Sequence, residues 1–158
     1  MIRPLTQDDA EELLALRLAN RDFLRPFDPD RDDSFFTLEA QRARIGEHGY
    51  AILDGDAIAG TISLSNLVRG AFQSANVGYW VDNARNGRGL ATRALAAMVE
   101  EAFGELGLHR LEAGTLVDNV ASQRVLEKNA FERVGLARRY LHIGGDWRDH
   151  LLFQRIAE

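Results

Sequence analysis

The sequence contains no cysteine, only three prolines and no long hydrophobic run, and these absences exclude several classes of structure and chemistry. Without cysteine there is no disulfide, no thiolate nucleophile and no cysteine-based metal site. The longest apolar runs fall well short of the roughly 20 residues that span a bilayer, and no secretory signal precedes the first folded-looking segment. We therefore expect a cytoplasmic protein that does not associate with membranes.

The composition is that of a globular protein. Of the 158 residues, 46% are hydrophobic and 27% are charged, so we expect one domain spanning residues 1–158. The net charge of -5 and the isoelectric point near 5.4 disfavour a general nucleic-acid-binding surface. The four histidines are scattered without metal-ligand spacing, and we expect no metal site.

Hydrophobic periodicity predicts a mixed α/β order of elements. Turn signals separate the segments, and the acidic stretch at 21–34 is expected to be a loop. The last two strands are expected to form a hairpin with a long tip. Strands are predicted at 2–5, 50–53, 57–64, 75–81, 110–116, 132–137 and 150–156, and helices at 10–20, 37–47, 90–103 and 119–128.

A glycine-punctuated turn links the strand at 75–81 to the amphipathic helix at 90–103. Gly87 and Gly89 allow backbone conformations that a Cβ disfavours. The first turn of the helix leaves N–H groups without intrahelical partners at the positive end of the helix dipole, where phosphate binds well. The spacing matches neither the nucleotide-binding P-loop nor the dinucleotide glycine triplet. We therefore expect an anion site, to which Arg85 or Arg88 adds charge-assisted contacts.

Four separated features resemble the GCN5-related N-acetyltransferases (GNAT), in particular the branch that acetylates the N-termini of ribosomal proteins. They are Asn86-Gly87-Arg88-Gly89-Leu90-Ala91, the preceding Gly78-Tyr79-Trp80, the run from His109 to Phe131, and Trp147-Arg148-Asp149-His150. The resemblance implies a mixed α/β GNAT fold. In that fold a central, mostly antiparallel, twisted sheet of six to seven strands is flanked by about four helices, and its splayed central strands hold acetyl-CoA.

Acetyl-CoA is the co-substrate that this resemblance implies. Its pyrophosphate is expected at the glycine turn, and the amides of its pantetheine arm on the exposed edge of the preceding strand. Asn86 stands where the family usually has Gln or Arg, which removes reach or charge but leaves the backbone donors. The residues expected to bind acetyl-CoA are Trp80, Val81, Asp82, Asn86, Gly87, Arg88, Gly89, Leu90, Ala91, Thr92, Asn119 and Arg124.

Acetyl transfer by direct attack requires a proton for the departing thiolate. Many relatives use a tyrosine at the position of Leu126. Ser122 matches the serine of the ribosomal-protein branch and lies in the first turn of a predicted helix, where the dipole favours a developing thiolate. We therefore expect Ser122 to donate the proton, although it could simply stabilise the helix start. Tyr140 is a weaker alternative.

The general base is harder to assign, because Asn76 stands where relatives often have glutamate. Glu112 matches a family glutamate on the next strand and is the expected substitute. An ion pair between Glu112 and Arg110 is the competing interpretation. An α-amine titrates near 7.7–8.0 and needs less help than a lysine amine near 10.4, which favours an N-terminal amine as acceptor.

Three functions fit the sequence. The first is acetylation of a protein N-terminus of the ribosomal type, and the second is acetylation of a small amine such as a polyamine, an aminoglycoside or an amino acid. The third is a non-catalytic acyl-CoA sensor. The acidic stretch could attract a cationic peptide or could be a solvated loop. Relatives of this branch suggest a homodimer.

Overall fold

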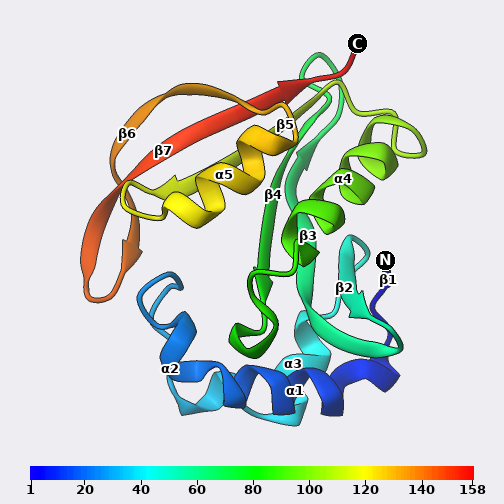
Figure 1. The fold of residues 1–158 in the computed structure, drawn as a ribbon, viewed down its shortest axis with the longest axis vertical. Helices are drawn as coiled ribbons and strands as arrows, with labels where there is room; N and C mark the ends of the chain where they lie inside the picture. Colours follow the sequence, from blue (N-terminus) through cyan, green and yellow to red (C-terminus); the bar gives the residue numbers. More distant parts are fainter.

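The computed structural model describes residues 1–158 and is built on a seven-stranded sheet (Figure 1). The strand order is β1-β2-β3-β4-β5-β7-β6, and every neighbouring pair is antiparallel except β4 and β5. The mixed α/β fold with a mostly antiparallel sheet is therefore confirmed. The strands are β1 (Ile2–Pro4), β2 (Gly49–Asp54), β3 (Ala57–Val68), β4 (Ser74–Val81), β5 (Arg110–Leu116), β6 (Glu132–Ile143) and β7 (Asp146–Ile156).

The parallel pair β4 and β5 separates part-way along its length. Only three residue pairs connect the two strands, the last being Asn76 with Glu112. Beyond it β4 continues to Val81 and β5 to Leu116, each still paired with its antiparallel neighbour on the other side. Figure 1 shows the two strands diverging. The inner edges of both strands therefore offer free backbone hydrogen-bonding groups to a ligand.

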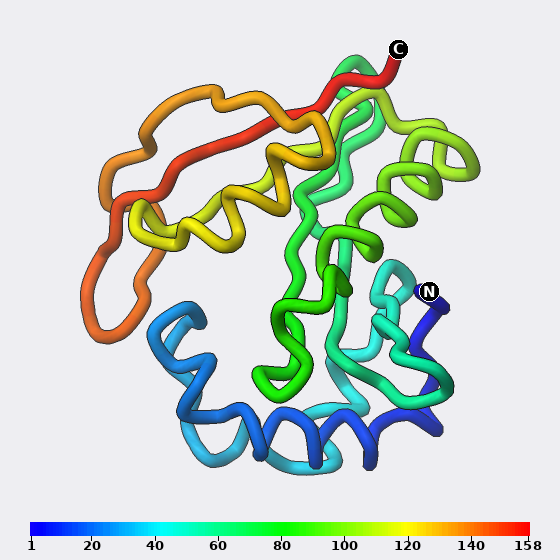
Figure 2. The backbone as a smooth tube through the Cα atoms, viewed as in Figure 1, coloured from blue at the N-terminus to red at the C-terminus, as the bar shows by residue number.

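Five α-helices accompany the sheet: α1 (Ala10–Ala19), α2 (Arg21–Leu24), α3 (Leu38–Arg44), α4 (Leu90–Phe103) and α5 (Val120–Lys128). The apolar stripe of α4 packs on the sheet and contributes to a cluster of 20 buried hydrophobic residues that also includes Ile62, Val77 and Phe153. Because α4 is anchored by this core, its N-terminus is held at the end of β4. The traced backbone shows α1 and α3 side by side, well away from α4 and α5 (Figure 2).

The structure corrects several predicted boundaries. The stretch 21–34 is not entirely a loop, because it contains α2 and the start of a 3-10 helix at Asp33–Phe35, which the Asp32 side chain caps through Ser34 N. Helix α3 ends at Arg44 rather than near Glu47. Strands β3, β6 and β7 run further than predicted, so the last hairpin turns tightly at Gly144 and Gly145. None of the helices has the length and hydropathy that a membrane span requires.

Candidate active site

The glycine turn has the backbone geometry that the sequence predicts for an anion site. Gly87 and Gly89 adopt φ values of 80° and 75°, and Gly89 caps the start of α4. The first backbone N–H to bond within this helix is that of Arg93, which donates to Gly89 O at 3.1 Å. The three preceding N–H groups of α4, at residues 90–92, therefore remain available to a ligand.

Two arginines of the turn are tied to one aspartate. Arg88 donates two hydrogen bonds to Asp54, at 2.9 and 3.1 Å, and Arg85 donates a third to the same carboxylate at 3.0 Å. These bonds fix the turn to the β2–β3 hairpin. Arg85 Nε also lies 3.4 Å from Asp82, so these two guanidinium groups are matched by two carboxylates. The guanidinium of Arg93 donates to the Arg88 carbonyl oxygen at 3.0 Å and forms no ion pair, so it leaves a positive charge beside the free N–H groups, which suits a phosphate.

A cavity of about 190 Å³ fills the fork between β4 and β5. The start of α5, the β6–β7 hairpin and the segment around Phe27 close it. Its walls combine apolar side chains with polar groups from Tyr79, Thr115, Asn119, Ser122 and His150. The residues lining this fork cavity are Phe27, Pro29, Val77, Gly78, Tyr79, Ala113, Gly114, Thr115, Leu116, Asn119, Ser122, Leu126, Leu141, Ile143 and His150.

Two hydroxyl groups form a hydrogen-bonded pair at the wall of this cavity. The Tyr79 hydroxyl lies 3.0 Å from Ser122 Oγ and 3.3 Å from the Ser122 carbonyl oxygen. Burial raises the pKa of Tyr79 to about 12, although the Ser122 hydrogen bond acts in the opposite direction. Tyr79 is therefore protonated at neutral pH. Asn119 Oδ1 accepts a hydrogen bond from Ser122 N at 3.2 Å and caps α5, which places the serine in the first helical turn.

Comparison with known proteins agrees with this geometry. The sequence model of the acetyltransferase (GNAT) domain matches residues 1–132, which is most of the chain. The protein belongs to the GNAT family.

Named relatives of this GNAT enzyme are N-acetyltransferases. The probable N-acetyltransferase YjcK of Bacillus subtilis is 44% identical, over 94% of this chain and 89% of YjcK. The crystal structure of a ribosomal-protein-S5-alanine acetyltransferase from Vibrio fischeri has a TM-score of 0.94 and 31% identity, covering 98% of this chain and 91% of that one. RimJ of Mycobacterium smegmatis, solved in complex with CoA-disulfide, has a TM-score of 0.88 and 33% identity, with coverage of 99% and 81%. This acetyltransferase is therefore related to ribosomal-protein acetyltransferases.

The acetyltransferase holds Glu112 in an ion pair rather than at the fork cavity. Glu112 Oε1 accepts a hydrogen bond from Arg110 Nη2 at 2.8 Å, and Glu112 is not among the residues that line the cavity. The same arginine also donates to Ser74 Oγ and Gln154 Oε1, so it links three strands. The contacts therefore favour the structural interpretation of Glu112 that the sequence left open.

His150 is a cavity residue that sequence reasoning did not select. It is 3% exposed, and its Nδ1 lies 2.9 Å from the Arg148 carbonyl oxygen. A carbonyl oxygen can only accept, so we assign the ring proton to Nδ1, which leaves the Nε2 lone pair free in the neutral ring. No local sequence pattern around His150 indicates this role. The residue reaches the fork only because β7 pairs with β5, which lies on one side of it.

The remaining predicted acetyl-CoA residues have different surroundings. Asp82 Oδ1 accepts hydrogen bonds from Asn20 Nδ2 at 3.0 Å and from Ala84 N, which ties the end of β4 to α1. Trp80 packs under Arg17, whose guanidinium carbon lies 5.0 Å from the indole centroid. Val81 and Leu90 are buried, whereas Ala91 and Thr92 are half-buried. Arg124 is exposed on α5 and forms no ion pair.

The four aspartates of the acidic stretch are all engaged within the protein. Asp33 pairs with Arg21 at 2.8 Å, and Asp28 lies 3.9 Å from Arg31. The other two, Asp30 and Asp32, accept backbone N–H groups of Gly145 and Ser34. The ion pairs of Asp28 and Asp33 reduce the capacity of these two carboxylates to attract a cationic peptide.

Leu126, at the usual tyrosine position, is fully buried in the core, so it offers no chemistry there.

Proposed function

We propose that this enzyme transfers the acetyl group of acetyl-CoA to the N-terminal α-amine of a protein by direct attack. The observation that carries the proposal is the pair of hydroxyl groups, Tyr79 and Ser122, 3.0 Å apart at the wall of the fork cavity. The relationship to the ribosomal-protein-S5-alanine acetyltransferase supports a protein N-terminus as acceptor. The CoA-disulfide complex of RimJ supports a coenzyme A donor.

The residues present fit coenzyme A. The glycine turn offers three unpaired N–H groups and the guanidinium of Arg93, which has no carboxylate partner, and both suit the pyrophosphate. From Val77 onward the inner edge of β4 has no strand partner, so it can pair with the amides of pantetheine. Acetyl-CoA supplies the acetyl group as a thioester, whose carbonyl the amine attacks.

In this proposal Ser122 gives the proton that the departing thiolate needs. Tyr79 can donate its hydroxyl proton to Ser122 Oγ, because burial keeps the phenol protonated. The serine proton is then free to point into the cavity. The first turn of α5 adds its N–H groups and the positive end of its dipole, both of which favour a developing thiolate. Tyr79 therefore acts through Ser122 as a positioning residue.

His150 is better placed than Glu112 to take a proton from the attacking amine. Its Nε2 is the free acceptor of a ring that lines the cavity, whereas Glu112 is bound to Arg110 outside it. The demand on this base is small, because an appreciable fraction of an α-amine is already neutral near pH 7.5. A single weak base therefore suffices for this acceptor.

Release of free thiol from acetyl-CoA, with N-terminal peptides and small amines as acceptors, tests the proposal. We expect turnover with peptides and a decrease in kcat of about 100-fold or more for Ser122→Ala, with unchanged affinity for acetyl-CoA. Ser65→Ala, an exposed serine on β3 outside the fork cavity, is the matched control and should behave as wild type.

Each other outcome has a defined meaning. Full activity of Ser122→Ala removes the serine from the mechanism. Binding of acetyl-CoA without turnover for any amine points to a sensor, and turnover with small amines alone points to the small-molecule function.

Tyr79→Phe should lower kcat by about tenfold with little change in KM, since it removes one hydrogen bond that orients the serine.

A further inference from the structure

A second cavity, of about 100 Å³, lies beside the fork cavity and is rich in arginine. Helices α1 and α2 and the segment up to Phe36 form it. Pro29 lines both cavities, so the two are neighbours. The lining residues are Arg17, Arg21, Leu24, Arg25, Asp28, Pro29, Asp30, Arg31, Phe35 and Phe36.

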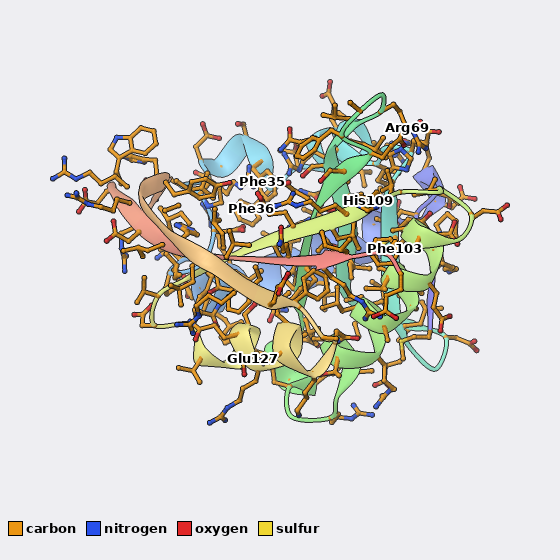
Figure 3. All side chains as sticks on the ribbon, turned by 90° about the horizontal axis from the view of Figure 1, so that it is seen from above. Phe35, Phe36, Arg69, Phe103, His109 and Glu127 are labelled. Atoms are coloured by element: carbon orange, nitrogen blue, oxygen red, sulfur yellow. The ribbon has the colours of Figure 1, made fainter.

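Three guanidinium groups surround the ring of Phe35 at this cavity. Their central carbons lie 5.3 Å (Arg17), 4.5 Å (Arg31) and 5.0 Å (Arg44) from the ring centroid. We call these three residues the arginine cluster. Phe36 stacks edge-on against Phe35, with centroids 5.0 Å apart, and the two rings are labelled in Figure 3. Cation–π contacts thus hold three like charges close together.

The arginine cluster is not balanced by carboxylates. Asp28 is the one carboxylate near it, 3.9 Å from Arg31 Nε, while Arg17 and Arg44 form no ion pair. The other charged lining groups already have partners elsewhere. These pairs are Arg21 with Asp33, Arg25 with Asp22, and Asp30 with Gly145 N and His142. Three positive charges therefore face a single negative charge.

Two buried donors of the cluster also lack acceptors. The Nε atoms of Arg17 and Arg31 are buried and have no hydrogen-bond partner. Burial lowers the pKa of Arg17 to about 10. The charge of Asp28 raises this pKa, whereas the charges of Arg44 and Arg31 lower it further. Buried donors and like charges without partners are costly, and an anion in the cavity offsets the positive charge of the cluster.

The cluster adjoins the fork cavity. Arg17 contacts Trp80, which follows Tyr79 on β4, and Pro29 borders both cavities. We propose that the arginine cluster binds an acidic side chain of the acceptor, so that preferred substrates are protein N-termini with Asp or Glu within their first few residues. This inference rests on the proposed function and specifies its substrate class.

Matched peptides test the inference. Peptides that begin with alanine and differ only in Glu or Gln at positions 2–4 should differ in kcat/KM by about tenfold or more in favour of Glu, mainly through KM. Arg17→Gln should remove this preference and leave the Gln peptides unaffected. Arg42→Gln makes the same charge change on α3 at an exposed residue outside the cavity, and it should keep the preference. If Arg17→Gln does not fold, Arg44→Gln replaces it as the test variant, because Arg44 is an exposed member of the cluster.

Calorimetric binding of the acetylated product peptides separates this inference from the proposed function. The Glu peptides should bind wild type more tightly than the Gln peptides, and binding should equalise in Arg17→Gln, whether or not transfer is observed. Equal binding of both peptides to wild type overturns the inference, as does a preference that survives in both cluster variants. If small anionic amines, such as free glutamate or 2-aminoethyl phosphate, bind more strongly than the Glu peptides, the assignment of the anion to a peptide is overturned.

Discussion

Gly60 on β3 is the residue whose substitution should most directly displace the strand that carries the site. An ideal Cβ on Gly60 lies 2.9 Å from Val81 Cα and even closer to the Trp80 carbonyl oxygen. Both contacts are with the β4 backbone, which cannot turn away as a flexible side chain does. Gly60→Ala therefore forces the end of β4, and the glycine turn that follows it, away from β3.

The size of this effect follows from the distances. Carbon atoms are most stable about 3.5–4.0 Å apart, so the new Cβ and Val81 Cα must separate by roughly 0.6 Å or more. The shift must be larger at Trp80 O. Overpacking of this kind costs about 1–3 kcal/mol. For a chain of this size, each kcal/mol lowers Tm by about 2–4 °C.

Urea denaturation followed by circular dichroism and by tryptophan fluorescence measures the effect. Gly78→Ala is the matched control on β4, because its Cβ meets no atom within 4 Å and its φ is not positive. We expect Gly78→Ala to be as stable as wild type or more stable by about 0.4–1 kcal/mol. Gly60→Ala should also weaken acetyl-CoA binding. A free energy of unfolding for Gly60→Ala within about 0.5 kcal/mol of wild type would refute the reasoning.

Two further predictions concern the cap of α5 and the acid stability of the protein. Asn119→Ala removes the side-chain acceptor of Ser122 N and should cost about 1 kcal/mol in urea denaturation, with a decrease in kcat, whereas Asn119→Asp should restore stability. The paired hydrogen bonds from Arg3, at 2.8 and 2.9 Å, lower the pKa of Asp9 to about 2. The stability from this pair is present above about pH 4, the unfolded value, and is lost as pH falls towards 2. Arg3→Gln should therefore be less stable than wild type at neutral pH, and the difference should shrink as pH falls through that range. A difference that does not change with pH would show that the lost stability does not come from the ion pair.

Local patterns were sufficient to predict most of the sheet and the glycine turn. The alternation of side chains between the two faces of β4 is a signal within that strand, and the apolar stripe of α4 is a signal within that helix. The turn between the two elements spans only a few residues. The fork itself follows from the resemblance, which implied splayed strands. The sequence did not show that β4 and β5 part after Asn76, because that position depends on pairing between strands more than 30 residues apart.

The residues that sequence reasoning missed meet only through tertiary contacts. Tyr79 reaches Ser122 across the fork, and His150 reaches the cavity through the pairing of β7 with β5. The arginine cluster joins α1, α3 and the segment between them around Phe35. No spacing within a single element predicts any of these encounters. The partners of the acidic stretch also depend on tertiary contacts, such as that of Asp30 with Gly145 N on the β6–β7 hairpin.

Two sets of contacts fix the width of the fork. They are the strand pairing within each half of the sheet and the hydrogen bonds of Asn129, which link α5 to α4 and β7. Strand β4 stays paired with β3 up to Val81, and β5 stays paired with β7 up to Leu116, so closing the fork would break established ladders. Asn129, at the end of α5, donates to the Thr92 carbonyl oxygen of α4 at 3.1 Å, and its own carbonyl oxygen accepts from Arg155 of β7 at 2.7 Å. The start of α4, which carries the anion turn, is thereby linked to the half that carries Ser122. The anion turn and Ser122, the proposed proton donor, are consequently held in a fixed relative position.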